Sequence, residues 1–203
     1  MSTLQWGGRF ANAPDSQLLA FGSSLEEDLV LAPFDVECSR AHVAALSAGG
    51  ILNESQATTL LGALQSVRGE VADGSFAEAA RAGRFEDVHG AIDARVRALA
   101  GETGEWLHAG RSRNDQVATT LLLYVRDRAR GAARRTHAIA NAIALRARSE
   151  FEAGTLLAAC THRQPAQPAM LGFVLVAWAE PFVRATARFL AVRRAAAAAS
   201  PLG

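Results

Sequence analysis

Two arginines and an asparagine stand together where the sequence predicts the start of a long helix. Arg111, Arg113 and Asn114 fall in the run RSRNDQ, in which Ser112 and Asp115 have the spacing of a capping box. The first backbone N–H groups of a helix carry partial positive charge and bind anions. Guanidinium groups add forked hydrogen bonds to carboxylates. The pattern therefore predicts a site for a small polycarboxylate, although a capped, Arg-rich helix start can also be purely structural.

Two histidines are candidates for proton transfer. His162 lies in a polar stretch between Thr161 and Gln164, and His89 follows Asp87 near a predicted helix start. An imidazole titrates near neutral pH, which suits a general acid or base. The alternative for His162 is a solvated loop residue, and for His89 a surface charge pair.

Four stretches, in order along the chain, resemble the signature blocks of the argininosuccinate lyase family, in the aspartase/fumarase superfamily. They are Trp6–Phe10, Glu86–His89, Ser112–Gln116 and Thr161–Pro168. A fifth stretch, Ser200–Gly203, looks like the opening of a further block. One block alone would be a weak signal, but four in order across the chain are specific.

The resemblance implies roles for the residues that match. His162 is expected to be a catalytic acid/base, and Thr161 to contact the substrate. Arg111, Arg113 and Asn114 are expected to bind its carboxylates.

A looser match adds Ser24 as a substrate contact, although this serine is equally placed to cap the helix that follows it. The residues expected to support the site are Asp28, Asp87, His89 and Gln164.

The implied reaction is the reversible cleavage of argininosuccinate to arginine and fumarate, the last step of arginine biosynthesis. It needs no cofactor and no metal. The resemblance further implies a cytoplasmic homo-oligomer, a tetramer when full length, whose active sites are built from several subunits. We expect this chain to be an N-terminal fragment and inactive alone, since the family's serine-containing loop lies beyond residue 203.

Two residues depart from the family within the histidine block. Arg163 replaces a leucine and Pro165 replaces an arginine, which removes a cation and a backbone donor. A non-catalytic relative, such as a delta-crystallin-like structural protein or a decayed gene copy, is therefore an alternative. A superfamily lyase acting on adenylosuccinate or fumarate is another, against which Trp6–Phe10 and Ser112–Gln116 together argue.

Composition excludes several other classes of protein. The 203 residues include 21 basic and 20 acidic side chains, a balance that does not suggest a nucleic-acid partner. Apolar runs are too short for a membrane span, and the first residues lack the order of a secretory signal. Two cysteines, Cys38 and Cys160, form no disulfide framework, which is typical of a reducing compartment.

These residues need helices to position them, and the periodicity predicts an all-α fold. We expect one helix over 24–47, interrupted near Pro33, a second capped by Asn53, and a third from about Glu86 to Gly101. A continuous helix over 112–150 would be about 58 Å long.

A connecting loop over 152–164 and a second long helix after Pro168 follow. The predicted domains are a small helical one over 1–111 and, over 112–203, the incomplete beginning of a long-helix bundle of the fumarase/aspartase type. A rod of that length suits a bundle assembled from several subunits.

Overall fold

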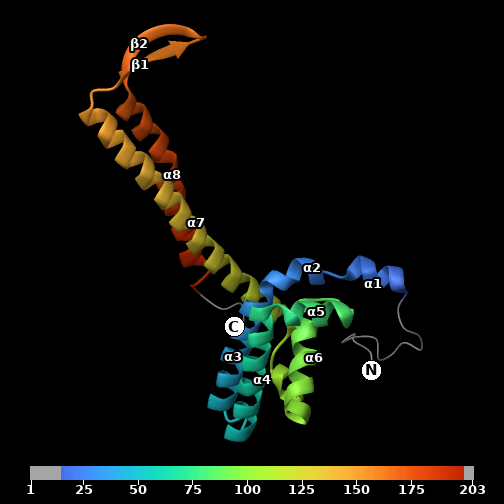
Figure 1. The fold of residues 1–203 in the computed structure, drawn as a ribbon. Coiled ribbons are helices and arrows are strands. Elements are labelled where there is room, and N and C mark those ends of the chain that lie inside the picture. The colour runs from blue at the N-terminus through green and yellow to red at the C-terminus, as the bar shows by residue number, and fades with distance from the viewer. Residues whose placement is uncertain (1–14, 199–203) are drawn as a thin grey trace. The chain divides into compact units, whose positions relative to one another are not determined.

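The structure, a computed structural model, describes residues 15–198, which group into two compact units, 15–121 and 122–198. Figure 1 shows the elements of each. Two predicted family blocks, Trp6–Phe10 and Ser200–Gly203, lie outside the described residues. A domain boundary at residue 111 remains a prediction.

The first unit consists of short helices around three longer ones. Its elements are α1 (Ser16–Gly22), α2 (Leu25–Asp28), η1 (Leu29–Leu31), α3 (Ala32–Ala48), α4 (Glu54–Asp73), α5 (Ser75–Ala82), α6 (Val88–Ala100), the 3-10 helix η2 (Gly101–His108) and the start of α7 (Arg113–Glu152).

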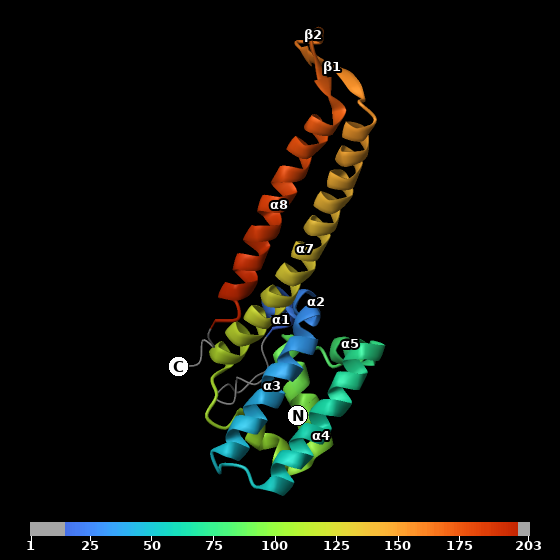
Figure 2. The same ribbon diagram turned by 90° about the vertical axis from the view of Figure 1, so that its left-hand side faces the viewer.

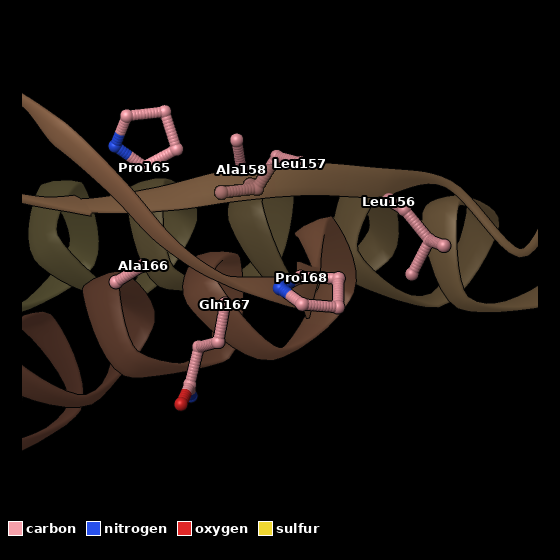
Figure 3. A pocket seen from close by; sticks show the side chains of 7 residues that line it. All are labelled: Leu156, Leu157, Ala158, Pro165, Ala166, Gln167 and Pro168. Atoms are coloured by element: carbon pink, nitrogen blue, oxygen red, sulfur yellow. The ribbon is translucent and has the colours of Figure 1, made fainter.

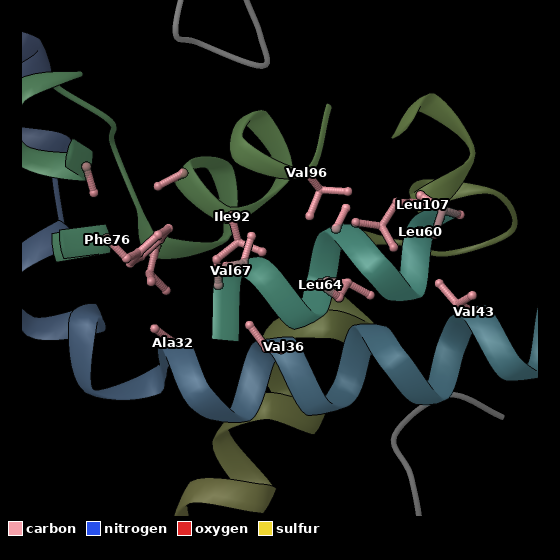
Figure 4. Packing of buried hydrophobic residues seen from close by; sticks show 14 of the residues in the cluster. Ala32, Val36, Val43, Leu60, Leu64, Val67, Phe76, Ile92, Val96 and Leu107 are labelled. Carbon is pink, nitrogen blue, oxygen red and sulfur yellow. The ribbon is translucent and has the colours of Figure 1, made fainter. Parts of the chain in front are cut away.

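The core of this unit lies between α3, α4, α6 and η2, as Figure 4 shows. Side chains at helical spacing meet there: Val36 and Val43 from α3, Leu60 and Leu64 from α4, and Ile92 from α6, all at most 1% exposed. Each buried aliphatic side chain of this size contributes about 1.5–3 kcal/mol of transfer free energy. Apolar side chains at helical spacing on α3, α4 and α6 thus make the core.

The predicted helices of this unit are present, and their ends follow local chemistry. Asn53 and Gln56 form a reciprocal capping box at the start of α4, with hydrogen bonds of 2.9 and 3.0 Å. The predicted interruption near Pro33 occurs just before it, at η1, and Pro33 occupies the first turn of α3, where its missing N–H costs nothing. Three helices that the sequence did not indicate are short: α1, α5 and the 3-10 helix η2.

The long helix predicted over 112–150 is confirmed as α7, which runs over 40 residues. In the second unit it lies beside α8 (Leu171–Ala195), as Figures 1 and 2 both show. Thr136 and Thr186 hydrogen-bond between the two helices at 2.8 Å. Small residues allow the close approach, since four of the five buried side chains of α7 in this unit are alanines: Ala129, Ala133, Ala140 and Ala147. The fifth is Glu150.

The prediction of a connecting loop over 152–164 is wrong. The chain forms an antiparallel hairpin there, with strands β1 (Leu156–Thr161) and β2 (Gln164–Met170), and α8 begins only after the second strand, at Leu171. The sequence did not indicate these strands because they contain alanines and two prolines, and neither residue type favours a sheet. Backbone pairing across a two-residue turn makes this hairpin, although most of its side chains are exposed.

The all-α class is confirmed, since the hairpin is the one sheet within residues 15–198. No helix in that range combines the length and apolar character needed to cross a membrane.

Candidate functional site

The start of α7 has the capped geometry that its sequence predicts. Ser112 Oγ accepts a hydrogen bond from the Asn114 N–H at 3.2 Å, and the Asp115 carboxylate accepts one from the Ser112 N–H at 3.3 Å. The cap orders the helix start, and the side chain of Asn114 is exposed there. An exposed amide beside a helix N-terminus can donate to an anion.

Arg113 brings a partly covered cation to this helix start. Its side chain is 26% exposed, and Nη1 donates to Gln116 Oε1 at 3.4 Å. The same nitrogen lies 4.0 Å from the Asp87 carboxylate. Asp87 in turn caps α6 by accepting from the Gly90 N–H at 2.5 Å. Two helix starts therefore meet at one guanidinium.

The Ser24 segment joins the same region from a distant part of the sequence. The Ser24 N–H donates to the Glu86 carbonyl at 2.9 Å, and Ser23 Oγ donates to that oxygen at 3.2 Å. Ser24 Oγ hydrogen-bonds the Asp28 carboxylate. Ser24 occupies the N-cap position of α2, but its side chain forms no capping hydrogen bond to the backbone of that helix. Predicted residues from three stretches of chain are brought together here.

Arg111 is partly buried and contacts α3. Its guanidinium donates to Ser39 Oγ on α3 at 3.3–3.4 Å. Burial lowers the pKa of Arg111, while the nearby Asp35 carboxylate opposes that shift. Its predicted contact with substrate remains a prediction.

A buried polar cluster lies beneath the start of α7. Asp35 on α3, fully buried, accepts hydrogen bonds from Gln116 Nε2 at 2.7 Å and from Thr120 Oγ1 at 3.3 Å. His89 belongs to this cluster, because it is 2% exposed and its Nδ1 lies 3.3 Å from Asp35 Oδ1. The surface charge pair considered for His89 is thus excluded, whereas its supporting role remains a prediction.

A second buried carboxylate, that of Asp93, lies one turn further along α6. It lies 3.1 Å from Arg97 Nη2 and 3.4 Å from His108 Nε2, and both of these partners are partly exposed. Burial lowers the pKa of His108. The Asp93 carboxylate opposes this shift, and nearby cations, Arg111 among them, add to it. His42 hydrogen-bonds the Ala109 carbonyl at 3.0 Å, and burial lowers its pKa too. The segment that leads into α7 is therefore held by polar contacts on both sides.

Thr161, His162 and Gln164 lie at the turn of the β1–β2 hairpin in the second unit. Thr161 pairs with Gln164, and the turn between them is made by His162 and Arg163, both with positive φ (49° and 64°). Two left-handed residues define a type I′ turn, which usually takes Asn and Gly. The turn exposes the imidazole of His162, which suits a group that exchanges protons with a ligand.

The departures from the family lie in the same hairpin. Pro165 is opposite Cys160, and Ala166 is an extra residue at a bulge in β2. Leu156, Ala158, Pro165, Gln167 and Pro168 are among the residues around an open apolar pocket of about 420 Å³ (Figure 3). None of the predicted site residues lines this pocket.

A smaller pocket, of about 240 Å³, adjoins the Ser24–Glu86 contact in the first unit. It is lined by Ser16, Leu19, Ala20, Ser23, Arg84, Phe85 and Glu86. No group of three or more His, Cys, Asp or Glu side chains in the described part of the chain is placed to hold a metal ion.

Sequence reasoning missed the buried acids Asp35 and Asp93 and the hydroxyl of Ser39. The signal that reveals Asp35 and Ser39 is their register, since both fall on the same helical stripe as Val36 and Val43. A charged residue on an apolar stripe is costly to bury without partners. Such a position therefore indicates a polar network.

Comparison with known proteins places the chain among lyases. A family model described as "Lyase" matches residues 8–203. The chain is 42% identical to the argininosuccinate lyase of Mycobacterium sp. (strain JLS), over 98% of this chain and 41% of that protein. It is 44% identical to the argininosuccinate lyase of Leifsonia xyli subsp. xyli, over 88% of this chain and 37% of that protein. It therefore spans about two-fifths of the length of these relatives.

Solved structures support the same fold. An EDDS lyase variant with bound fumarate matches with a TM-score of 0.70 and 26% identity, over 92% of this chain and 36% of that one. A fumarate lyase from Mesorhizobium sp. BNC1 matches with a TM-score of 0.67 at 24% identity, over 90% of this chain and 41% of that one.

Proposed function

The chain belongs to this lyase family, and from that premise we propose that it forms the N-terminal part of an argininosuccinate lyase. The reaction would cleave argininosuccinate to arginine and fumarate in the biosynthesis of arginine. The observation that carries the proposal is the meeting of Ser24, Asp87 and Arg113 beside the exposed Asn114 at the capped start of α7.

The chemistry of such an elimination explains why these groups suit it. A base removes a proton from the carbon next to a carboxylate, and the intermediate then carries extra charge on that carboxylate. Preorganised donors stabilise developing charge without reorganising. Arg113, Asn114 and the helix start are donors of that kind. We assign them to the carboxylate of the substrate, with Ser24 as a further hydrogen-bonding contact.

We assign proton transfer to His162, contributed by a subunit of the assembled enzyme, with Thr161 as its neighbouring substrate contact. Asp28, Asp87, His89 and Gln164 would support the site, and Arg111 would add a second cation close to α3. We infer a cytoplasmic homo-oligomer, a tetramer at full length. The 203-residue chain alone would be inactive, since it spans two-fifths of its relatives.

A chimera tests this function. Residues 1–203 replace the matching N-terminal part of the Mycobacterium leprae argininosuccinate lyase, which is 41% identical over all of this chain. We expect the chimera to release fumarate from argininosuccinate, measured by ultraviolet absorbance. His162→Asn should lower kcat by about 10²–10⁴-fold, the usual contribution of a general acid or base.

His137→Asn is the matched control, because His137 is an exposed histidine on α7 with no proposed role. It should leave the rate unchanged. A chimera that folds but releases no fumarate would contradict the proposal. Recovery of activity in that chimera by Pro165→Arg would then favour the non-catalytic alternative, and turnover of adenylosuccinate in its place would favour a sister lyase.

A further inference from the structure

We propose that Asp35 is a positioning residue that holds Arg113 in place for carboxylate binding and acts through the side-chain amide of Gln116. This role deepens the proposed function, and only the identity of the ligand, a substrate carboxylate, rests on that function. The ordering of Arg113 itself is a property of the first unit and can be measured in this chain.

The first step is the contact between α3 and α7. Asp35 Oδ1 accepts from Gln116 Nε2 at 2.7 Å and from Thr120 Oγ1 at 3.3 Å. Gln116 and Thr120 are four residues apart, so they lie on one face of α7, one turn above the other. A single carboxylate oxygen therefore holds the first two turns of α7 against α3.

The second step is the orientation of the Gln116 amide. An ionised carboxylate only accepts hydrogen bonds, so the NH₂ end of the Gln116 side chain faces Asp35. The opposite end of the same amide, Oε1, then accepts from Arg113 Nη1 at 3.4 Å. Asp35 thereby determines that an acceptor, and not a donor, faces the guanidinium.

The third step is what this contact does for Arg113. An arginine side chain has many rotamers, and immobilising it on binding costs affinity unless it is already held. Arg113 is about a quarter exposed, and its Nη1 lies near two acceptors, Gln116 Oε1 at 3.4 Å and the Asp87 carboxylate at 4.0 Å. The buried carboxylate of Asp35 thus preorganises a carboxylate-binding cation through one intervening side chain.

The burial of Asp35 is the observation that an account based on stability alone does not explain. It is fully buried on the same stripe as Val36, and its Oδ2 has no hydrogen-bond partner among the described residues. Apolar side chains in place of the whole cluster, Asp35 together with its partners, would often be as stable or more stable. A positioning role accounts for the charged residue.

The first test measures Arg113 in the ¹⁵N-labelled 203-residue chain by NMR, through solvent exchange of its guanidinium Nη–H protons, the group that contacts Gln116. We expect Asp35→Leu and Gln116→Met each to raise this exchange at least about fivefold, and the conservative Asp35→Asn to lie between wild type and Asp35→Leu. Gln116→Met approaches the same link from α7, which keeps the test decisive if one variant fails to fold.

Val36→Ala is the matched control, because it destabilises the same helix by a cavity and leaves the three-residue link intact. Its Arg113 exchange should stay within about twofold of wild type at a temperature where each variant is folded. The proposal is overturned if Asp35→Leu leaves Arg113 exchange unchanged, or if Val36→Ala raises it as much.

The second test is a double-mutant cycle in the chimera. Asp35→Leu should lower kcat/KM at least about tenfold, but cause no further loss in an Arg113→Ala background, because both changes remove one function. Losses that multiply would mean that Asp35 acts independently of Arg113 and would overturn the link. An inactive parent chimera would count against the proposed function alone, and the NMR measurement would still decide the positioning role.

Discussion

Adding one methyl group at Gly104 should destabilise the first unit, because η2 lies in direct contact with α6 there. A Cβ built on Gly104 would lie 2.6 Å from the Arg97 Cα and 3.2 Å from the Arg97 N. Both atoms are backbone, so no side-chain rotation relieves the clash, and η2 must move away from α6. The segment that would shift leads directly into Arg111 and the start of α7.

The magnitude follows from two opposing effects. Overpacking of this kind costs about 1–3 kcal/mol, and the smaller backbone freedom of the variant's unfolded chain returns about 0.4–1 kcal/mol. The net destabilisation of Gly104→Ala is therefore about 1–2 kcal/mol. For a unit of about this size, each kcal/mol corresponds to roughly 4–8 °C in Tm, so we expect a decrease of roughly 5–15 °C.

Gly62→Ala provides the matched control, since it is the same chemical change in the interior of α4 with no atom within 4 Å of the added Cβ. It should stabilise the unit by about 0.5–1 kcal/mol, because alanine favours a helix over glycine. The assay is a thermal melt followed by circular dichroism, with hydrogen exchange of α6 peptides to report on the first unit alone. A Gly104→Ala variant as stable as wild type would refute the assigned contact between η2 and α6.

Three further results are expected. Because burial lowers the pKa of His42 and of His108, their neutral forms favour the fold, and their contribution is complete above the unfolded pKa of about 6.5. The free energy of unfolding in urea should fall as pH drops through that value, and His108→Gln should flatten the slope; an unchanged slope would contradict this. Burial also raises the pKa of the Cys38 thiol, so a thiol reagent should label the exposed Cys160 quickly and Cys38 slowly, and Cys160→Ser should remove the fast phase and not the slow one. Arg163→Gly should slow amide exchange in the hairpin, because a non-glycine residue in the left-handed conformation costs about 1 kcal/mol, which glycine avoids. Faster exchange would argue against a type I′ turn.

Features decided by neighbouring residues were predictable. The cap of α4 needs only Asn53 and Gln56, and the start of α7 needs only Ser112, Asn114 and Asp115. Hydrogen bonds across three residues form wherever the helix forms, so spacing alone reveals them. The length of α7 followed in the same way from continuous apolar periodicity without an internal proline.

The hairpin was not predictable, because its strands are held by backbone pairing and most of their side chains are exposed. The alternation of apolar and polar residues that usually indicates a strand is therefore missing. Leu156–Thr161 is mostly Leu and Ala, and β2 contains Pro165 and Pro168. Intrinsic preference argued for a loop. The context of two adjacent long helices, whose ends the chain must connect, overrode that preference.

Residue types and local spacing were enough to show which groups could bind a carboxylate or move a proton, and that a capped helix would present some of them. The contacts between distant residues became known only from how the helices pack: Asp35 meets Gln116 from 81 positions away, and Ser23 lies against Glu86 from 63 positions away. The burial of His89 beside Asp35 likewise excluded the surface charge pair that its sequence position allowed. Such contacts depend on the packing of separate helices, and no local spacing encodes which polar groups will then share one buried space.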